Sequence, residues 1–315
     1  MRLPDRKRIA PLAPHGDGDE SFVMQPVIIE MVPNGETRVE RNPATPRAPA
    51  AIARELLALT DQGASLIHNH IDDFRLTGEA AAERYGEGWA PLLARHPDAI
   101  LCPTTAAGSS DAAKIAHFAP CAERGARMAP LDPGSMNMPI SGGGAECARM
   151  LSYINDFTRI AMVLDTISRA GLAASIGIYE PGFLRATIAF QRAGKLPPGS
   201  FVKFYFFGGR NYYDGTPCIG FGLDPTPAAL DAYLDILGDS GLPWAAAVIG
   251  GDVFASGMAK LAIARGGGVR VGLEDFGGDR TPTNATLLGE VVALCREAGR
   301  PPASAREAAA ILGLR

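Results

Sequence analysis

The chain has 315 residues, of which 47% are hydrophobic and 20% charged, and this composition is typical of a globular protein rather than a disordered one. Its 30 basic and 34 acidic residues give a formal net charge of -4, with no Lys/Arg block, so we expect no nucleic-acid partner. The apolar runs are far shorter than the roughly 20 residues that a membrane span needs, and no secretion signal is recognisable. We therefore expect no membrane partner. The five cysteines are scattered and suggest no disulfide framework, so we expect a cytoplasmic protein.

Short β-rich apolar runs alternate with segments of helical periodicity along the whole chain. Strands are predicted at 26–32, 64–70, 98–104, 126–131, 173–179, 201–207, 244–249 and 268–274. Helices are predicted at 48–62, 80–95, 111–123, 146–170, 182–193, 226–239, 254–265 and 281–298. This alternation indicates parallel strands, and eight strand–helix units favour an α/β fold of the (β/α)₈ TIM-barrel type. A doubly wound sheet is the rival, but the first strand is not followed by a GxGxxG turn.

The two ends of the chain differ from this pattern. Residues 1–24 are charged, rich in proline and glycine and aperiodic, which predicts an N-terminal arm. Residues 303–313 predict a last short helix. The predicted organisation is therefore an arm at 1–24 followed by a single catalytic barrel domain at 25–315 that includes a C-terminal helix.

The second predicted strand ends in His68, Asn69 and His70. Because strand side chains alternate between faces, both histidines point to the same side, which in a barrel is the mouth where active sites lie. Two imidazoles at this spacing can bind one metal ion, with zinc–nitrogen distances of roughly 2.0–2.1 Å. A hydrogen-bonded pair of core histidines fits the same spacing, so the pattern alone leaves both possibilities open.

The eighth predicted strand ends in a cluster of charge. Alternation places Arg270, Gly272 and Glu274 on one face, with Asp275 at the start of the following loop. Glu274 could pair with Arg270 inside the barrel, since a buried arginine needs a carboxylate. It could instead be a third metal ligand, since two histidines and one carboxylate form a common catalytic zinc set.

Several stretches of the chain resemble the β-keto acid cleavage enzyme family, and they follow one another in the same order. They are PNGET at 33–37, NPATP at 42–46, GASLIHNH at 63–70, PTTAAG at 103–108, RMAPLDPGSMN at 127–137, IYEPG at 178–182, WAAAVIG at 244–250, VRVGLEDF at 269–276 and the closing GRPPASAREAAAILGL at 299–314. Each motif alone is weak, but together they cover almost the whole chain.

The resemblance implies a zinc-dependent barrel enzyme that acts as an acyltransferase and cleaves a carbon–carbon bond. Such an enzyme takes a β-keto acid and acetyl-CoA and produces acetoacetate and a new acyl-CoA. The resemblance also implies one Zn²⁺ per chain, no other cofactor and a homotetramer. The expected partners are thus the two small-molecule substrates and further copies of the chain.

The resemblance also assigns roles to residues of this sequence. His68, His70 and Glu274 match the family's zinc ligands. Asp275 and Arg270 match its catalytic pair, with Asp275 as the general base and Arg270 as a fixed positive charge for a developing oxyanion. A helix N-cap is the alternative role for Asp275. Further expected site residues are Glu36 in catalysis and Thr104, Thr105, Ser135 and Asn137 in substrate binding.

Two departures from the family pattern keep a second enzyme class open. The run Ile71-Asp72-Asp73 after the histidines lacks an arginine that the family commonly has, and Gly251 and Asp252 stand where it usually has a cation followed by a bulky residue. The alternative is a zinc-dependent retro-aldol or decarboxylating lyase that acts on a β-keto or β-hydroxy acid without CoA. An amidohydrolase is disfavoured because no histidine follows His117. Ligand types alone do not separate zinc from manganese, iron or nickel.

Overall fold

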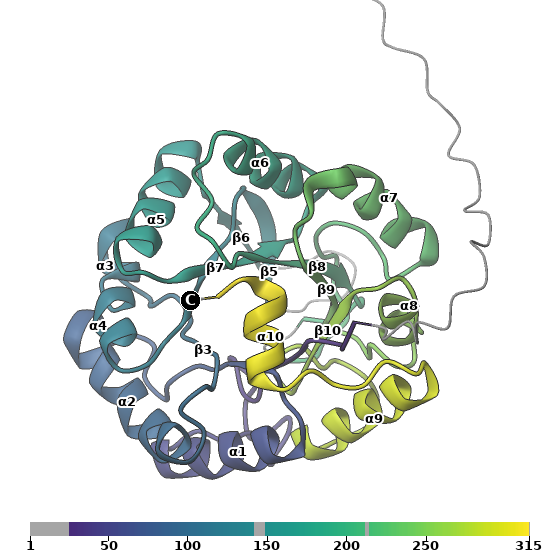
Figure 1. Cartoon of the computed structure of the whole chain (residues 1–315), viewed down its shortest axis with the longest axis horizontal. Helices are drawn as coiled ribbons and strands as arrows, with labels where there is room; N and C mark the ends of the chain where they lie inside the picture. Colours follow the sequence, from purple (N-terminus) through teal and green to yellow (C-terminus); the bar gives the residue numbers. More distant parts are fainter. Residues whose placement is uncertain (1–24, 142–148, 212–213, 315) are drawn as a thin grey trace, which may run out of the picture.

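The computed structural model describes residues 25–141, 149–211 and 214–314, so the predicted arm at 1–24 lies outside the described residues. Eight parallel strands form one sheet in the order β3-β2-β1-β10-β9-β8-β7-β4. A parallel bridge between Leu101 and Ala126 brings the β3 and β4 ends of this sheet together. The sheet is surrounded by a ring of helices (Figure 1). The predicted (β/α)₈ barrel is therefore confirmed.

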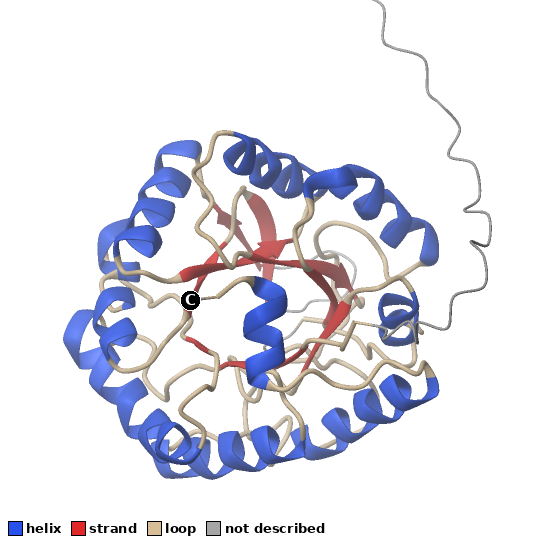
Figure 2. Cartoon of the chain, viewed as in Figure 1, coloured by secondary structure: helices blue, strands red, loops and turns tan. Residues whose placement is uncertain are grey.

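The barrel strands are short and apolar. They are β1 (Ile29–Met31), β2 (Leu66–His68), β3 (Leu101–Cys102), β4 (Met128–Leu131), β7 (Ala173–Ile178), β8 (Phe201–Phe207), β9 (Trp244–Ile249) and β10 (Gly268–Val271). Nearly all of their residues are buried, because helices cover the outer face and side chains fill the interior. Figure 2 shows this arrangement, with the strands inside and the helices outside.

The helices follow the strands along the chain. They are α1 (Pro49–Gln62), α2 (Gly78–Arg95), α3 (Asp111–Ile115), α4 (Phe118–Glu123), α5 (Phe157–Arg169), α6 (Pro181–Arg192), α7 (Pro227–Leu237), α8 (Met258–Ala264), α9 (Asn284–Glu297) and α10 (Ala305–Leu312). Several begin at side-chain caps, such as Asp156, which accepts a hydrogen bond from the backbone N–H of Arg159. In the described part of the chain, none of these helices has the length and hydropathy needed to cross a membrane.

Two predicted helices differ from the structure. The predicted helix at 146–170 begins instead with β6 (Arg149–Tyr153), which pairs antiparallel with β5 (Met136–Ser141) in a hairpin after β4. The predicted helix at 111–123 is divided into α3 and α4. Proline lacks the N–H that a continuous helix would need at Pro120, whereas in α4 this residue lies in the first turn, where no such bond is required.

The last helix, α10, covers one end of the barrel. It lies across the centre of the ring in Figure 1. Its Ala308 and Leu312 belong to a buried apolar cluster with residues from the beginnings of the strands, among them Ile28, Leu66 and Phe201. A capping box fixes its first turn, because Ser304 and Glu307 each accept a hydrogen bond from the other's backbone N–H. The amino end of the barrel is thereby filled with apolar side chains.

Candidate active site

Three potential metal ligands lie beyond the carboxyl ends of β2 and β10, the two strands that flank β1. His68 is the last residue of β2, and His70 follows it by two residues. Glu274 does not extend a strand as predicted, because β10 ends at Val271 and Gly272 has a φ of +157°. The chain turns there, and the backbone N–H of Glu274 donates a hydrogen bond to the carbonyl of Val32. The turn, not strand alternation, brings this carboxylate to the histidines.

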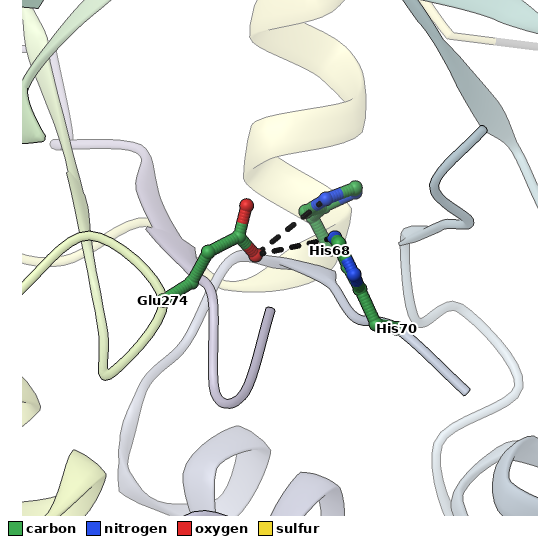
Figure 3. A group of neighbouring side chains, drawn as sticks. All are labelled: His68, His70 and Glu274. Carbon is green, nitrogen blue, oxygen red and sulfur yellow. Dashed lines mark ion pairs between the residues drawn. The ribbon is translucent and has the colours of Figure 1, made fainter. Parts of the chain in front are cut away.

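The carboxylate of Glu274 faces both imidazoles. Its Oε2 atom lies 3.7 Å from His68 Nε2 and 3.8 Å from His70 Nε2, as Figure 3 shows. One candidate ligand atom from each of the three residues lies within 4.8 Å of the others. The two separations from Glu274 are close to the roughly 3.4 Å that two bonds of about 2.0–2.2 Å give at a tetrahedral centre, so small side-chain movements would let one ion contact all three residues.

The bonding state of these side chains fits a cation. Glu274 Oε2, the oxygen that faces both imidazoles, is a buried atom without a hydrogen-bond partner among the described residues. Burial, together with the charge of Arg270, lowers the pKa of His68 well below its usual value, so the ring is the neutral imidazole that binds metals. His70 Nδ1 lies 3.2 Å from Glu36 Oε1, the carboxylate–histidine contact that typically orients a metal-bound ring.

Two asparagines fix the backbone around the histidines. The side chain of Asn34 accepts a hydrogen bond from the backbone N–H of His70 (2.9 Å) and donates one to its carbonyl (2.9 Å). Asn69 accepts a hydrogen bond from the indole N–H of Trp89 (2.8 Å), a residue of α2. The segment that carries both rings is therefore attached to the loop after β1 on one side and to a helix on the other.

Arg270 and Asp275 form a buried pair beside the three ligands. The guanidinium donates to both carboxylate oxygens of Asp275, at 2.8 and 3.0 Å, and also to Glu274 Oε1 at 2.9 Å. The Arg270–Glu274 pair and the metal-ligand arrangement are thus compatible, because each uses a different oxygen of Glu274. Asp275 caps no helix, since α9 begins at Asn284 after the cap residue Thr283. Burial raises the pKa of Asp275, although Arg270 opposes this.

These groups line a cavity of about 350 Å³ at the carboxyl end of the barrel. Of the predicted substrate-binding residues, Thr104 and Thr105 belong to its lining. The backbone of Thr104 is held on both sides, since its N–H donates to the hydroxyl of Tyr85 and its carbonyl lies 2.7 Å from His117 Nε2. Ser135 and Asn137 are exposed in the segment before and within β5 and are not among the lining residues.

Comparison with known protein families identifies the family of the chain. A family model described as beta-keto acid cleavage enzyme matches residues 26–314, which is nearly the whole chain. The protein belongs to the β-keto acid cleavage enzyme family. The resemblance of its motifs is thus confirmed, and the chain is an enzyme of this family.

Curated proteins with related sequences support the same assignment. The 3-keto-5-aminohexanoate cleavage enzyme of Fusobacterium nucleatum is 28% identical over 296 residues, which cover 92% of this chain and 98% of that protein. The 3-oxoadipate:acetyl-CoA acetyltransferase of Cupriavidus necator is 27% identical over 306 residues and covers 92% of this chain and 95% of its own length. A solved complex of ObcA with oxaloacetate has a TM-score of 0.63 at 15% identity and covers 86% of this chain and 68% of that one, a likeness of fold.

The cavity of this family member also contains polar residues that the sequence patterns did not single out. Lys203 lies on β8 and Ser175 lies on β7. Asp132 directly follows β4, and Tyr153 is the last residue of β6. Below them Glu30 of β1 is fully buried. Lys203 and Glu30 stand inside otherwise apolar strands, which is a signal that strand alternation could have used.

The absence of a side chain at Gly35 leaves room for Glu274. Gly35 has a φ of +49°, and a Cβ there would lie 2.2 Å from Glu274 Cγ. We expect Gly35→Ala to displace the carboxylate and to lower metal content and activity together, as measured by metal analysis and kcat/KM. The matched control is Gly171→Ala, which has a φ of +68° and open space around the added methyl. Equal losses in the two variants would attribute the effect to backbone strain alone.

Proposed function

We propose that this protein is a zinc-dependent enzyme that condenses a β-keto acid with acetyl-CoA and releases acetoacetate and a new acyl-CoA. The observation that carries the proposal is the placement of Asp275 and Arg270 directly beside His68, His70 and Glu274 in one cavity. Family membership and the acetyl-CoA acetyltransferase relative support the same reaction. Zinc is the preferred ion because neutral imidazoles and one carboxylate are common ligands of catalytic zinc.

The three ligands would hold the cation in a position to reach the acid. A divalent cation there would polarise the keto and carboxylate oxygens and make the hydrogen on the carbon between them more acidic. Glu36, through its contact with His70 Nδ1, would set the orientation of that ring. We therefore propose that Glu36 is a positioning residue, which acts on the reaction by orienting the ring of His70.

Asp275 is the proposed base, and the reaction balances without a further reactant. Its carboxylate removes a proton from C2 of the acid, and the carbanion attacks the acetyl-CoA carbonyl, which releases the CoA thiolate. The thiolate then attacks the original keto carbonyl. The bond between that carbon and C2 breaks, and the proton from Asp275 returns to C2 to give acetoacetate and the acyl-CoA. Arg270 supplies a fixed positive charge beside the developing oxyanions.

The direct experiment joins metal analysis to a substrate screen. The purified protein is analysed for bound metals and assayed for acetoacetate formation from acetyl-CoA and β-keto acids of varied charge and length. About one zinc per chain with acetoacetate release that depends on acetyl-CoA supports the proposal. Bound zinc with cleavage independent of CoA would replace it with the lyase alternative, and a protein without a stoichiometric metal would refute it.

The quaternary state also stays a proposal. We propose a homotetramer, as the family resemblance implies, and exposed apolar side chains lie close together in sequence at Leu151, Ile154 and Phe157. Light scattering coupled to size-exclusion chromatography measures the mass directly. A monomer at micromolar concentration would refute this part of the proposal.

A further inference from the structure

The cavity has a wall opposite the metal-ligand group. In the closed order of strands, β2 lies opposite β8, and β10 lies opposite β4. The histidines and Glu274 follow the ends of β2 and β10, so an acid held there by its keto and carboxylate oxygens would extend its side chain toward β8 and β4. This opposite wall is formed by Lys203 and Tyr205 of β8, Ser175 of β7 and Asp132 after β4. Its chemistry therefore faces the variable part of the substrate.

Lys203 places a buried ammonium group in this wall. Its side chain is 3% exposed, and its Nζ donates a hydrogen bond to Ser175 Oγ at 2.6 Å. The nearest carboxylate is Glu30, whose Oε1 lies 3.6 Å away, beyond hydrogen-bond distance. Among the described residues, Ser175 accepts one hydrogen bond from Lys203 Nζ, whereas an ammonium group has three N–H donors.

Two carboxylates that pair with cations of the cavity lining do not line the cavity themselves. Glu30, fully buried, lies near both Lys203 and Arg270 and does not line the cavity. Arg159 and Lys114, which do line it, both pair with Asp111, which does not. Glu30 and Asp111 are therefore absent from the cavity lining, whereas Asp132 lies in the lining near the same cations.

Asp132 is the acidic residue of this wall, and its oxygens are partly engaged. Tyr153 donates a hydrogen bond from its hydroxyl to Asp132 Oδ2 at 2.7 Å. Burial raises the pKa of Asp132, while this hydrogen bond and the nearby cations act in the opposite direction. The other oxygen occupies the space above Gly177, where an added Cβ would lie 2.5 Å from it. The Oδ2 atom of Asp132 is thus already engaged by Tyr153.

We propose that Lys203 determines substrate specificity and selects β-keto acids whose side chain ends in an anionic group, in particular a second carboxylate. The inference rests on the proposed function and adds the substrate class. The ammonium group of Lys203 donates no hydrogen bond to Glu30, which lies 3.6 Å away, and a terminal carboxylate of the substrate would accept such hydrogen bonds instead. An ammonium-terminated side chain would meet a like charge, and a methyl-terminated one would leave the desolvated ammonium without a new partner.

The test compares three six-carbon 3-oxo acids that end in a carboxylate, a methyl group or an ammonium group. For the unaltered enzyme we expect kcat/KM to be about 10- to 150-fold higher for the dicarboxylate than for the methyl-terminated acid, the range of one hydrogen bond to a charged group. Lys203→Met should reduce this ratio to near one, mainly through KM of the dicarboxylate. Lys260→Met, at an exposed position of α8, should leave the ratio unchanged.

A binding measurement separates this inference from the proposed reaction. Calorimetry of the same three acids with the metal-loaded enzyme, without acetyl-CoA, reports the preference even if turnover fails. Absence of turnover for all acids would refute the proposed function, whereas turnover without a dicarboxylate preference, or with one that survives Lys203→Met, would overturn the role of Lys203. If Lys203→Met does not fold, the Glu30→Gln/Lys203→Met double variant removes both charges of the buried pair and serves the same comparison.

Discussion

Glu274→Gln should yield a protein that has lost its metal and its activity together. The amide oxygen can still accept the hydrogen bond from Arg270, but the atom in the place of Oε2 is no longer an anionic ligand between the two histidines. Loss of one of three protein ligands exceeds the 10- to 100-fold effects typical of residues behind the ligands, so we expect kcat/KM to fall by about 10³-fold or more. Metal content per chain should fall well below one.

The measurement is metal analysis after dialysis, together with steady-state kinetics and thermal unfolding. Glu87→Gln is the control, because Glu87 is exposed, pairs with Arg84 and is not among the residues that line the cavity. A Glu274→Gln protein that keeps a full complement of metal would show that this carboxylate serves only as the partner of Arg270. The same loss in both variants would point to the general removal of a negative charge.

Asp275→Asn should differ from Glu274→Gln in one respect, because it should lose activity but keep its bound metal. Asparagine keeps the size of the side chain and one oxygen that Arg270 can contact, but it has no carboxylate to accept a proton. General-base contributions are typically 10²- to 10⁴-fold, so kcat should fall by about that factor with a smaller change in KM. Exchange of the C2 hydrogens of the β-keto acid in deuterated water, followed by NMR without acetyl-CoA, isolates the proton-transfer step.

Enzyme-dependent C2 exchange should disappear in Asp275→Asn and persist in the control Asp98→Asn, which changes an exposed residue. If the exchange rate in Asp275→Asn equals that of the unaltered enzyme, another group is the base. A loss of bound metal in this variant would instead show that Asp275 acts by holding the ligand arrangement. Metal content therefore distinguishes the two expected phenotypes.

The barrel was predictable because its signal is local. Each strand is a short apolar run and each outer helix an amphipathic segment, and eight such pairs in order are sufficient to indicate the fold. The β5–β6 hairpin was not predicted, because Leu151, Tyr153 and Ile154 have spacings that also fit a helix. The strand conformation of Leu151 and Tyr153 depends on pairing with 136–141, a contact that periodicity does not report.

The sequence predicted that His68, His70 and Glu274 lie together, but it predicted only part of the backbone geometry that places them. His68 and His70 face the same carboxylate, as strand alternation predicts. Glu274 was expected there by the same argument and does face the histidines, yet it arrives through a turn after Gly272, so the strand argument was wrong for this residue. Turns that end strands depend on backbone contacts across the sheet, here with Val32, and these are not visible in the sequence.

The opposite wall of the cavity was the least predictable part. Lys203 is conspicuous within an apolar strand, but its proximity to Ser175 and Glu30 depends on strand order and register around the barrel. Ser135 and Asn137, in contrast, were predicted to bind substrate but do not line the cavity. Their motif resembles a substrate-binding loop, but the hairpin exposes both, while Met138 and Leu151 join the lining.

The position of α10 bears on the kinetic order of the reaction. Because this helix and the apolar strand beginnings fill the amino end, the described cavity is reached from the carboxyl end, where the lining includes the exposed Phe74 and Leu151. In the proposed reaction, an acid bound at the metal-ligand group would enter before the bulky thioester covers the cavity. Acetoacetate, formed at the same group, would then leave after the acyl-CoA. Acetoacetate is thus expected to compete with the keto acid for the free enzyme, the inhibition pattern of a compulsory-order mechanism.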